Sequence, residues 1–86
     1  MQLINVGFDN AVNADRIVAV VAPDSAPIKR LIQSAKEQGR LLDATQGRKT
    51  ASVIITDCDY VILSYFSADR IKEKNQVSEN GEGITW

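Results

Sequence analysis

The sequence predicts an α+β fold, in which a small, mainly antiparallel sheet packs on one main helix at about residues 26–38 and a short C-terminal helix follows. Three observations predict it. The segment from Arg16 to Ala22 is apolar and β-branched after its first residue, which is typical of a strand covered on both faces. Residues 26–38 have apolar side chains at helical spacing. Residues 51–65 hold two strand-like segments around a short polar turn.

The main helix has clear start and stop signals. Ser25 is a good N-cap residue, with Asp24 as its rival, and Pro27 falls in the first turn, where its missing N–H costs nothing. Gly39 marks the C-terminal end. The apolar face is formed by Ile28, Leu31, Ile32 and Ala35.

The N-terminal and central segments are shorter. Residues 3–6 are compatible with a strand that ends in the turn-forming cluster 7–10, whereas residues 10–15 fit no single element. Residues 41–42 indicate a brief strand, and residues 45–49 indicate a polar turn.

The C-terminal part is expected to hold strands at 51–56 and 60–65, joined by a hairpin turn at residues 57–59. Ser67 can cap a final helix at 68–74, which Asn75 would end. Residues 76–86 are polar and contain glycine, so they are predicted to be a disordered tail after a single domain at 1–75.

The chain is small, at 86 residues, and a domain of this size buries only about 60% of its unfolded surface. Cys58 is the only cysteine and histidine is absent, so neither a disulfide nor a metal site is expected to stabilise the fold. Self-association is the remaining common solution.

No basic segment follows Met1, and the longest apolar run, residues 17–22, is too short to span a bilayer. We therefore expect a cytoplasmic protein without a membrane partner.

The charge is unevenly distributed although the net charge is −1. Residues 16–49 carry seven basic and three acidic residues, whereas residues 1–15 carry two acids and no base. Residues 50–86 carry three bases and six acids. A fold that gathers the central block on one face could present a positive surface to an anionic partner, although a solvated helix surface would explain the same charges.

Five cations are candidate contacts for nucleic acid. Arg48 and Lys49 lie in a turn beside a glycine, where they could meet phosphate or a narrow minor groove, or could simply be solvated. Lys29 and Arg30 lie in the first turn of the main helix, where the helix dipole disfavours cations. Arg16 precedes the apolar strand and could be an edge charge or an interface partner.

The aromatic residues Tyr60, Tyr65, Phe66 and Trp86 do not interleave with the bases along the chain, so a stacking platform for RNA is not indicated.

Catalysis is poorly supported. In the segment 47–50, Arg48 follows the glycine where a P-loop needs lysine, and position 42 is leucine where it needs glycine. Asp57 and Asp59 are explained by turn formation, and Cys58 between them has no histidine to activate it. We expect no enzyme activity, no cofactor, no metal and no small-molecule substrate.

Taken together, the residues resemble the RemA family of small bacterial regulators of extracellular-matrix and biofilm genes. The similarity covers residues 3 to about 64. The segments that carry it are Ile4–Asn10, Arg16–Val21, Ala22–Arg30, Leu42–Arg48 and Val53–Asp57.

The resemblance implies a DNA-binding transcriptional regulator that forms a ring-shaped homo-oligomer, bends double-stranded DNA over a repeated basic patch and is nucleoid-associated. By this resemblance, Arg48 matches an arginine important for DNA binding and Arg16 matches one needed for activity. Lys49 and Ala51 stand where relatives often carry arginine, and Gln46 where they often carry histidine. The alternative is a ring-forming protein-interaction module that does not bind DNA.

Overall fold

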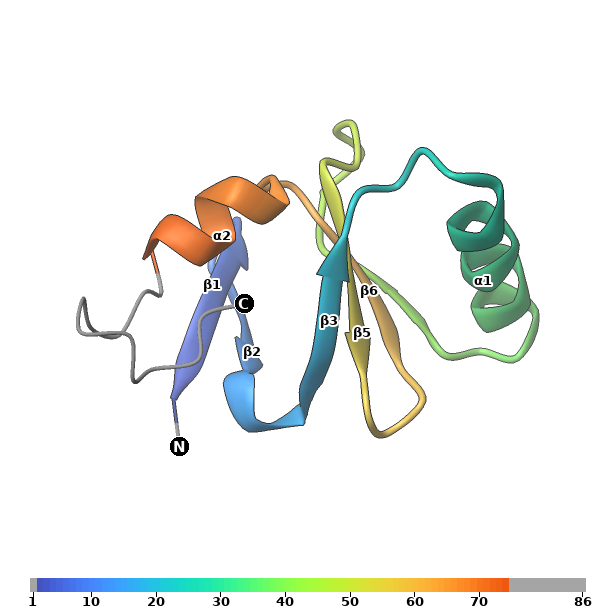
Figure 1. Ribbon diagram of the computed structural model, residues 1–86, viewed down its shortest axis with the longest axis horizontal. Coiled ribbons are helices and arrows are strands. Elements are labelled where there is room, and N and C mark those ends of the chain that lie inside the picture. The colour runs from blue at the N-terminus through green and yellow to red at the C-terminus, as the bar shows by residue number, and fades with distance from the viewer. Residues whose placement is uncertain (1, 75–86) are drawn as a thin grey trace.

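The computed structural model describes residues 2–74 of the chain (Figure 1). In chain order the elements are β1 (Leu3–Gly7), β2 (Asn10–Asn13), the 3₁₀ turn η1 (Ala14–Arg16), β3 (Ile17–Val21), α1 (Ala26–Glu37), β4 (Leu41–Asp43), β5 (Ser52–Thr56), β6 (Val61–Ser64) and α2 (Ala68–Lys74).

The strands form two sheets rather than the single sheet expected. Strands β1 and β2 make an antiparallel hairpin, and the other four make a sheet in the order β3-β5-β6-β4. The β3–β5 and β5–β6 pairs are antiparallel, whereas β4 runs parallel to β6. The α+β class and the mainly antiparallel pairing are therefore confirmed.

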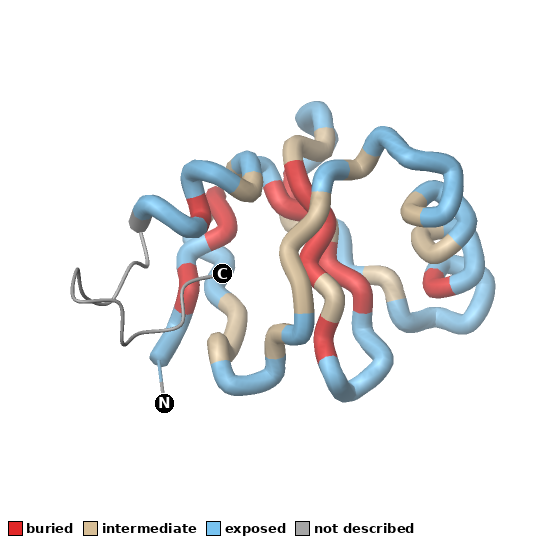
Figure 2. Tube along the Cα trace, in the orientation of Figure 1, coloured by how far each residue is buried: buried red, intermediate tan, exposed pale blue. Residues whose placement is uncertain are grey.

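The four-stranded sheet is the middle layer of the molecule, with α1 on one face and the β1–β2 hairpin together with α2 on the other (Figure 1). On the α1 face, Ala35 packs with Val53 and Val61. The opposite face holds the larger cluster, formed by Ile4, Val6, Ile54, Ile62 and Ile71. Figure 2 shows this burial concentrated in β5 and β6, between the two covering layers.

Helix α1 matches its sequence signals. The Ser25 side chain accepts a hydrogen bond from the backbone N–H of Ile28, as expected of an N-cap residue. The helix ends at Glu37, and Gly39 adopts a φ of +73°, the left-handed conformation in which glycine commonly follows a helix.

Strand β3 packs against the clusters on both faces of the sheet, as expected, through Ile17 and Val20 on one face and Val21 on the other. It pairs only with β5 and therefore forms an edge of the sheet. The register shifts between Ile17 and Ala19, and the intervening Val18 is 62% exposed. A bulge on an edge strand turns a side chain out of the regular alternation, which explains how an apolar run leaves a valine in solvent.

Residues 10–15, which sequence reasoning left unassigned, form the start of the 3₁₀ turn η1 and, before it, the second strand of the β1–β2 hairpin. The two-residue turn of the hairpin consists of Phe8 and Asp9, with φ angles of 53° and 65°. These left-handed conformations are uncommon outside glycine and asparagine. The Asn10 side chain donates hydrogen bonds to the carbonyl oxygens of Gly7 and Phe8, which stabilises the turn.

Helix α2 begins as predicted, because the Ser67 hydroxyl accepts a hydrogen bond from the backbone N–H of Arg70. Ile71 anchors the helix in the larger cluster and is fully buried. The predicted stop at Asn75 and the predicted tail at 76–86 lie outside the described residues. Within residues 2–74, no helix is long and apolar enough to cross a membrane.

Candidate nucleic-acid interface

The segment between β4 and β5, residues 44–51, is here called the cationic loop because it carries Arg48 and Lys49. Its base is fixed by Thr45, whose backbone N–H and hydroxyl both donate to Asp43 Oδ1 at 2.9 and 2.6 Å. The Thr45 carbonyl in turn accepts from the backbone N–H of Arg48 at 3.0 Å. Thr45 is only 2% exposed, so a buried residue holds a loop whose two cations are exposed.

The tip of the cationic loop reverses direction through Gln46 and Gly47, whose φ angles are 53° and 81°. A β-carbon at position 47 would meet no atom within 4 Å, so glycine is required there by backbone conformation and not by space.

The same hydrogen bonds change the acidity of Asp43. Those donated by the Thr45 hydroxyl and backbone N–H stabilise the carboxylate and lower the pKa of Asp43 below its ordinary value, against a small opposing effect of burial. The base of the loop therefore contains a carboxylate that stays ionised at neutral pH.

Arg48 lies against the turn of the β1–β2 hairpin. Its guanidinium carbon is 5.7 Å from the centroid of the Phe8 ring, within the range of a cation–π contact. Phe8 in turn packs on Tyr65, with 4.9 Å between ring centroids. Phe8, in its left-handed conformation, thus brings an aromatic ring of the β1–β2 turn against the cationic loop, which is distant in sequence.

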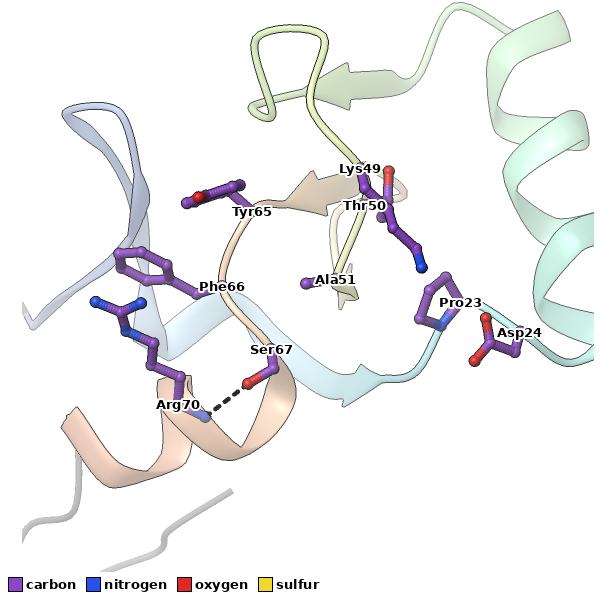
Figure 3. A pocket seen from close by; sticks show the side chains of 9 residues that line it. All are labelled: Pro23, Asp24, Lys49, Thr50, Ala51, Tyr65, Phe66, Ser67 and Arg70. Carbon is purple, nitrogen blue, oxygen red and sulfur yellow. Dashed lines mark hydrogen bonds between the residues drawn. The ribbon is translucent and has the colours of Figure 1, made fainter.

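A hollow of about 470 Å³, here called the loop hollow, opens beside the cationic loop (Figure 3). Lys49 lies on one side of it and Arg70, from α2, on the other. The remaining lining residues are Pro23, Asp24, Thr50, Ala51, Tyr65, Phe66 and Ser67.

Arg70 was not among the cations that the sequence singled out. Its guanidinium carbon is 4.2 Å from the centroid of the Phe66 ring. The available signal was the four-residue spacing between Phe66 and Arg70 at the start of a helix, a spacing at which side chains can meet. Aromatic residues and bases do not interleave along the chain. The fold nevertheless brings them together, because Arg48 lies over the Phe8 ring and Arg70 over the Phe66 ring.

Arg16 lies at the opposite end of the sheet from the cationic loop. It precedes β3 and forms an ion pair with Asp57 at 3.7 Å, in which both side chains are largely exposed. From Arg16 to the end of β3 at Val21 the chain extends about 17 Å at the usual rise of a strand. One protomer therefore does not bring Arg16 together with Arg48 and Lys49.

Lys29 and Arg30 are exposed on the first turns of α1, in the layer on the other face of the sheet. The start of α1 lies toward the end of the sheet that carries the cationic loop (Figure 1). Among residues 2–74, the ion pairs involve Arg16 with Asp57 and Arg40 with Asp59. The cations of α1, the cationic loop and Arg70 are thus without a carboxylate partner within that range.

The hairpin turn between β5 and β6 confirms the interpretation of its residues as turn formers. Asp57 and Asp59 each face a different arginine, and Asp59 has a φ of 73°. Cys58 is exposed between them, with its thiol 3.3 Å from the Thr56 hydroxyl.

The protein is thus of a small α+β class in which, among residues 2–74, cations without a carboxylate partner lie on the cationic loop and on the first turns of α1 and α2. Comparison with known proteins gives the family. The model described as "RemA-like: Extracellular matrix regulatory protein A-like" matches residues 3–74, and the chain belongs to this family.

Relatives match over nearly their whole length. One from Acetivibrio thermocellus is 53% identical over 79 residues, which cover 92% of this chain and 85% of the relative. One from Geobacillus thermodenitrificans is 53% identical over 85 residues, covering 94% and 98%. One from Alkaliphilus oremlandii is 50% identical over 84 residues, covering 98% and 90%. Each carries the name "Putative regulatory protein", which indicates a regulatory family.

Proposed function

We propose that this protein is a DNA-binding transcriptional regulator of extracellular-matrix genes that acts as a ring-shaped homo-oligomer. The observation that carries the proposal is the cationic loop, in which Arg48 and Lys49 are exposed and lack a carboxylate partner among residues 2–74. Exposed cations on a fixed loop suit contact with phosphate, because the charges are held in position before the DNA arrives.

Assembly explains how a chain of net charge −1 can hold DNA. A single cationic loop would bind weakly, but a ring repeats it, and each further contact then forms at high effective concentration. Such avidity can strengthen binding by about 10²–10⁴ without any new contact. A duplex that touches successive loops must follow the curve of the ring, so bendable sequences would be preferred.

The edges of the four-stranded sheet support self-association. Strands β3 and β4 are at opposite ends of the strand order, and each pairs on one side only. Val18 on β3 and Leu42 on β4 are 62% and 49% exposed. Two different edges on one protomer allow a head-to-tail contact, and contacts of this kind close into rings when the rotation between subunits permits.

We assign additional DNA contacts to the other candidate cations, Arg16, Lys29 and Arg30. Because Arg16 precedes the edge strand β3, it supports the DNA contact from a neighbouring subunit and not from the same one. Lys29 and Arg30 extend the positive surface from the first turns of α1.

The test is binding to a fluorescent duplex, followed by anisotropy between 50 and 200 mM salt. The variant R48A/K49A is expected to bind more weakly to all sequences, with the slope of log K against log salt reduced by about 0.9 for each lost phosphate contact. The control K36A/K72A removes two exposed cations outside the cationic loop and is expected to behave as the wild type. Unchanged affinity in R48A/K49A would reject the assignment.

The exposed sheet edges also favour a second candidate, a ring-forming protein-interaction module without DNA binding. The same titration separates the two, since the module predicts no salt-sensitive binding by the wild type. Native mass measured by light scattering reports assembly independently of DNA, and a monomer would remove the basis of the avidity argument.

A further inference from the structure

We propose that Arg70 is a further contact for the DNA backbone, held in position by the ring of Phe66, so that the interface extends from the cationic loop across the loop hollow to α2. The inference rests on the proposed function and adds a residue to its site.

The first argument is the state of the Arg70 side chain. Its guanidinium lies over the Phe66 ring at 4.2 Å, and the residue is exposed. Stacking uses one face of the guanidinium plane and leaves the N–H groups along its edge available. Within residues 2–74, no carboxylate or hydrogen-bond acceptor engages these groups. Among the described residues, the side chain is therefore oriented but not neutralised.

The second argument is the rigidity of the ring beneath it. The Phe66 carbonyl accepts hydrogen bonds from the hydroxyls of Ser52 and Ser64 at 2.6 and 3.1 Å, and its N–H donates to the Ser64 hydroxyl at 3.0 Å. Both serines are fully buried. Buried hydroxyls that converge on one residue fix its backbone, so the platform for Arg70 is set by the core of the protein.

The third argument is the position of Arg70 in its helix. Its backbone N–H donates to the Ser67 cap at 3.1 Å, which places it in the first turn of α2. A cation there opposes the helix dipole, whereas an acid such as the adjacent Asp69 complements it. An arginine at this point is poorly explained by helix stability and better explained by contact with an anion.

The fourth argument links Arg70 to the cationic loop. The rings of Phe8, Tyr65 and Phe66 form a continuous series, with centroids 4.9 and 6.0 Å apart. Arg48 lies over the first ring and Arg70 over the last. The two guanidiniums are thus held on one aromatic cluster, which fixes their spacing before any ligand binds.

The geometry favours backbone contact over stacking of single-stranded bases. Arg48 and Arg70 already occupy a face of Phe8 and of Phe66. The ring planes are tilted by 49° and 45° to their neighbours, so they do not present parallel faces to successive bases.

The experiment compares R70A with the wild type on duplex DNA between 50 and 200 mM salt. If Arg70 meets one phosphate, this fourfold rise in salt weakens the wild type about 3.5-fold more than R70A for each protomer engaged. R70K is expected to keep most of the salt slope, because it keeps the charge. The matched control K72A removes an exposed cation two residues further along the same helix, on its opposite side, and is expected to match the wild type.

The outcomes are distinct. If R70A keeps the wild-type affinity and salt slope while R48A/K49A loses both, the assignment of Arg70 is wrong and the proposed function stands. If the wild type shows no salt-dependent binding, the proposed function itself fails. If R70A impairs binding of a single-stranded oligonucleotide more than that of the duplex, the ring cluster is a stacking platform and the backbone assignment is overturned.

Discussion

Replacement of Thr45 by valine should separate the shape of the cationic loop from its charge. The side chain is 2% exposed, and valine has nearly the same volume. The substitution removes the 2.6 Å hydrogen bond from the hydroxyl to Asp43 but leaves the backbone N–H bond of 2.9 Å to the same carboxylate oxygen. No ionisable group is lost, so any change in DNA binding would come from the conformation of the loop.

The loss of unfolding free energy expected for T45V follows from the partner of the Thr45 hydroxyl, the Asp43 carboxylate. A hydrogen bond to a charged group contributes about 1.5–3 kcal/mol. Asp43 is exposed, so water replaces part of what the hydroxyl supplied, and the lower end of the range applies. The added buried methyl group of valine offsets about 0.8 kcal/mol. A net loss of about 0.7 kcal/mol remains, which for a domain of this size lowers the melting temperature by about 3–6 °C.

Thermal unfolding measures the stability change, and duplex anisotropy measures the effect on Arg48, whose backbone N–H is bonded to the Thr45 carbonyl. The matched control is T50V, which makes the same chemical change in the same loop. Among residues 2–74, the Thr50 hydroxyl has no partner comparable to that of Thr45. A melting temperature and a DNA affinity of T45V equal to those of the wild type would show that the contact between Asp43 and Thr45 does not hold the loop.

Two further predictions concern acid stability and assembly. The folded state lowers the pKa of Asp43, so its stabilising contribution is present above the unfolded pKa of about 3.9 and is lost as pH falls through the lower folded value. The difference in unfolding free energy between the wild type and D43N should therefore shrink below about pH 4, as measured by denaturant titration; a difference independent of pH would contradict the stated cause. The second change is V18K, which places a charge on the exposed edge of β3 and should lower the native mass with little loss of folding, because Val18 is already 62% exposed. The control Q33K adds the same charge to the exposed face of α1, and equal masses for the two variants would exclude β3 as a subunit interface.

Local signals predicted the elements whose structure is decided locally. Helix α1 follows from the Ser25 cap, and the brief strand β4 was identified from two leucines. The first strand and the turn of the β1–β2 hairpin were predicted, but the second strand was not, because the left-handed residues Phe8 and Asp9 lack the glycine that usually marks a two-residue hairpin turn. Propensity could not show that β3 is an edge strand, since its exposure is decided by which strands pair with it.

The candidate site was predictable only in part. Arg48 and Lys49 were found because they adjoin each other and a glycine in a polar turn. Arg70 lies 22 positions beyond Arg48, and only the packing of three rings from two distant segments relates them. Arg16 is the opposite case. It was a predicted site residue, but it lies at the end of the sheet away from the cationic loop.

The buried Ser64 hydroxyl shares its one proton between the carbonyls of Phe66 and Val6, at 3.1 and 3.3 Å, and so links the last strand to the first. During synthesis, the apolar side of the β1–β2 hairpin therefore stays exposed until β6 and α2 have left the ribosome, because these elements help to cover it. A chain cut short before Ile71 would lose one of the five buried residues of the larger cluster. Such a fragment would expose apolar surface and be prone to aggregation.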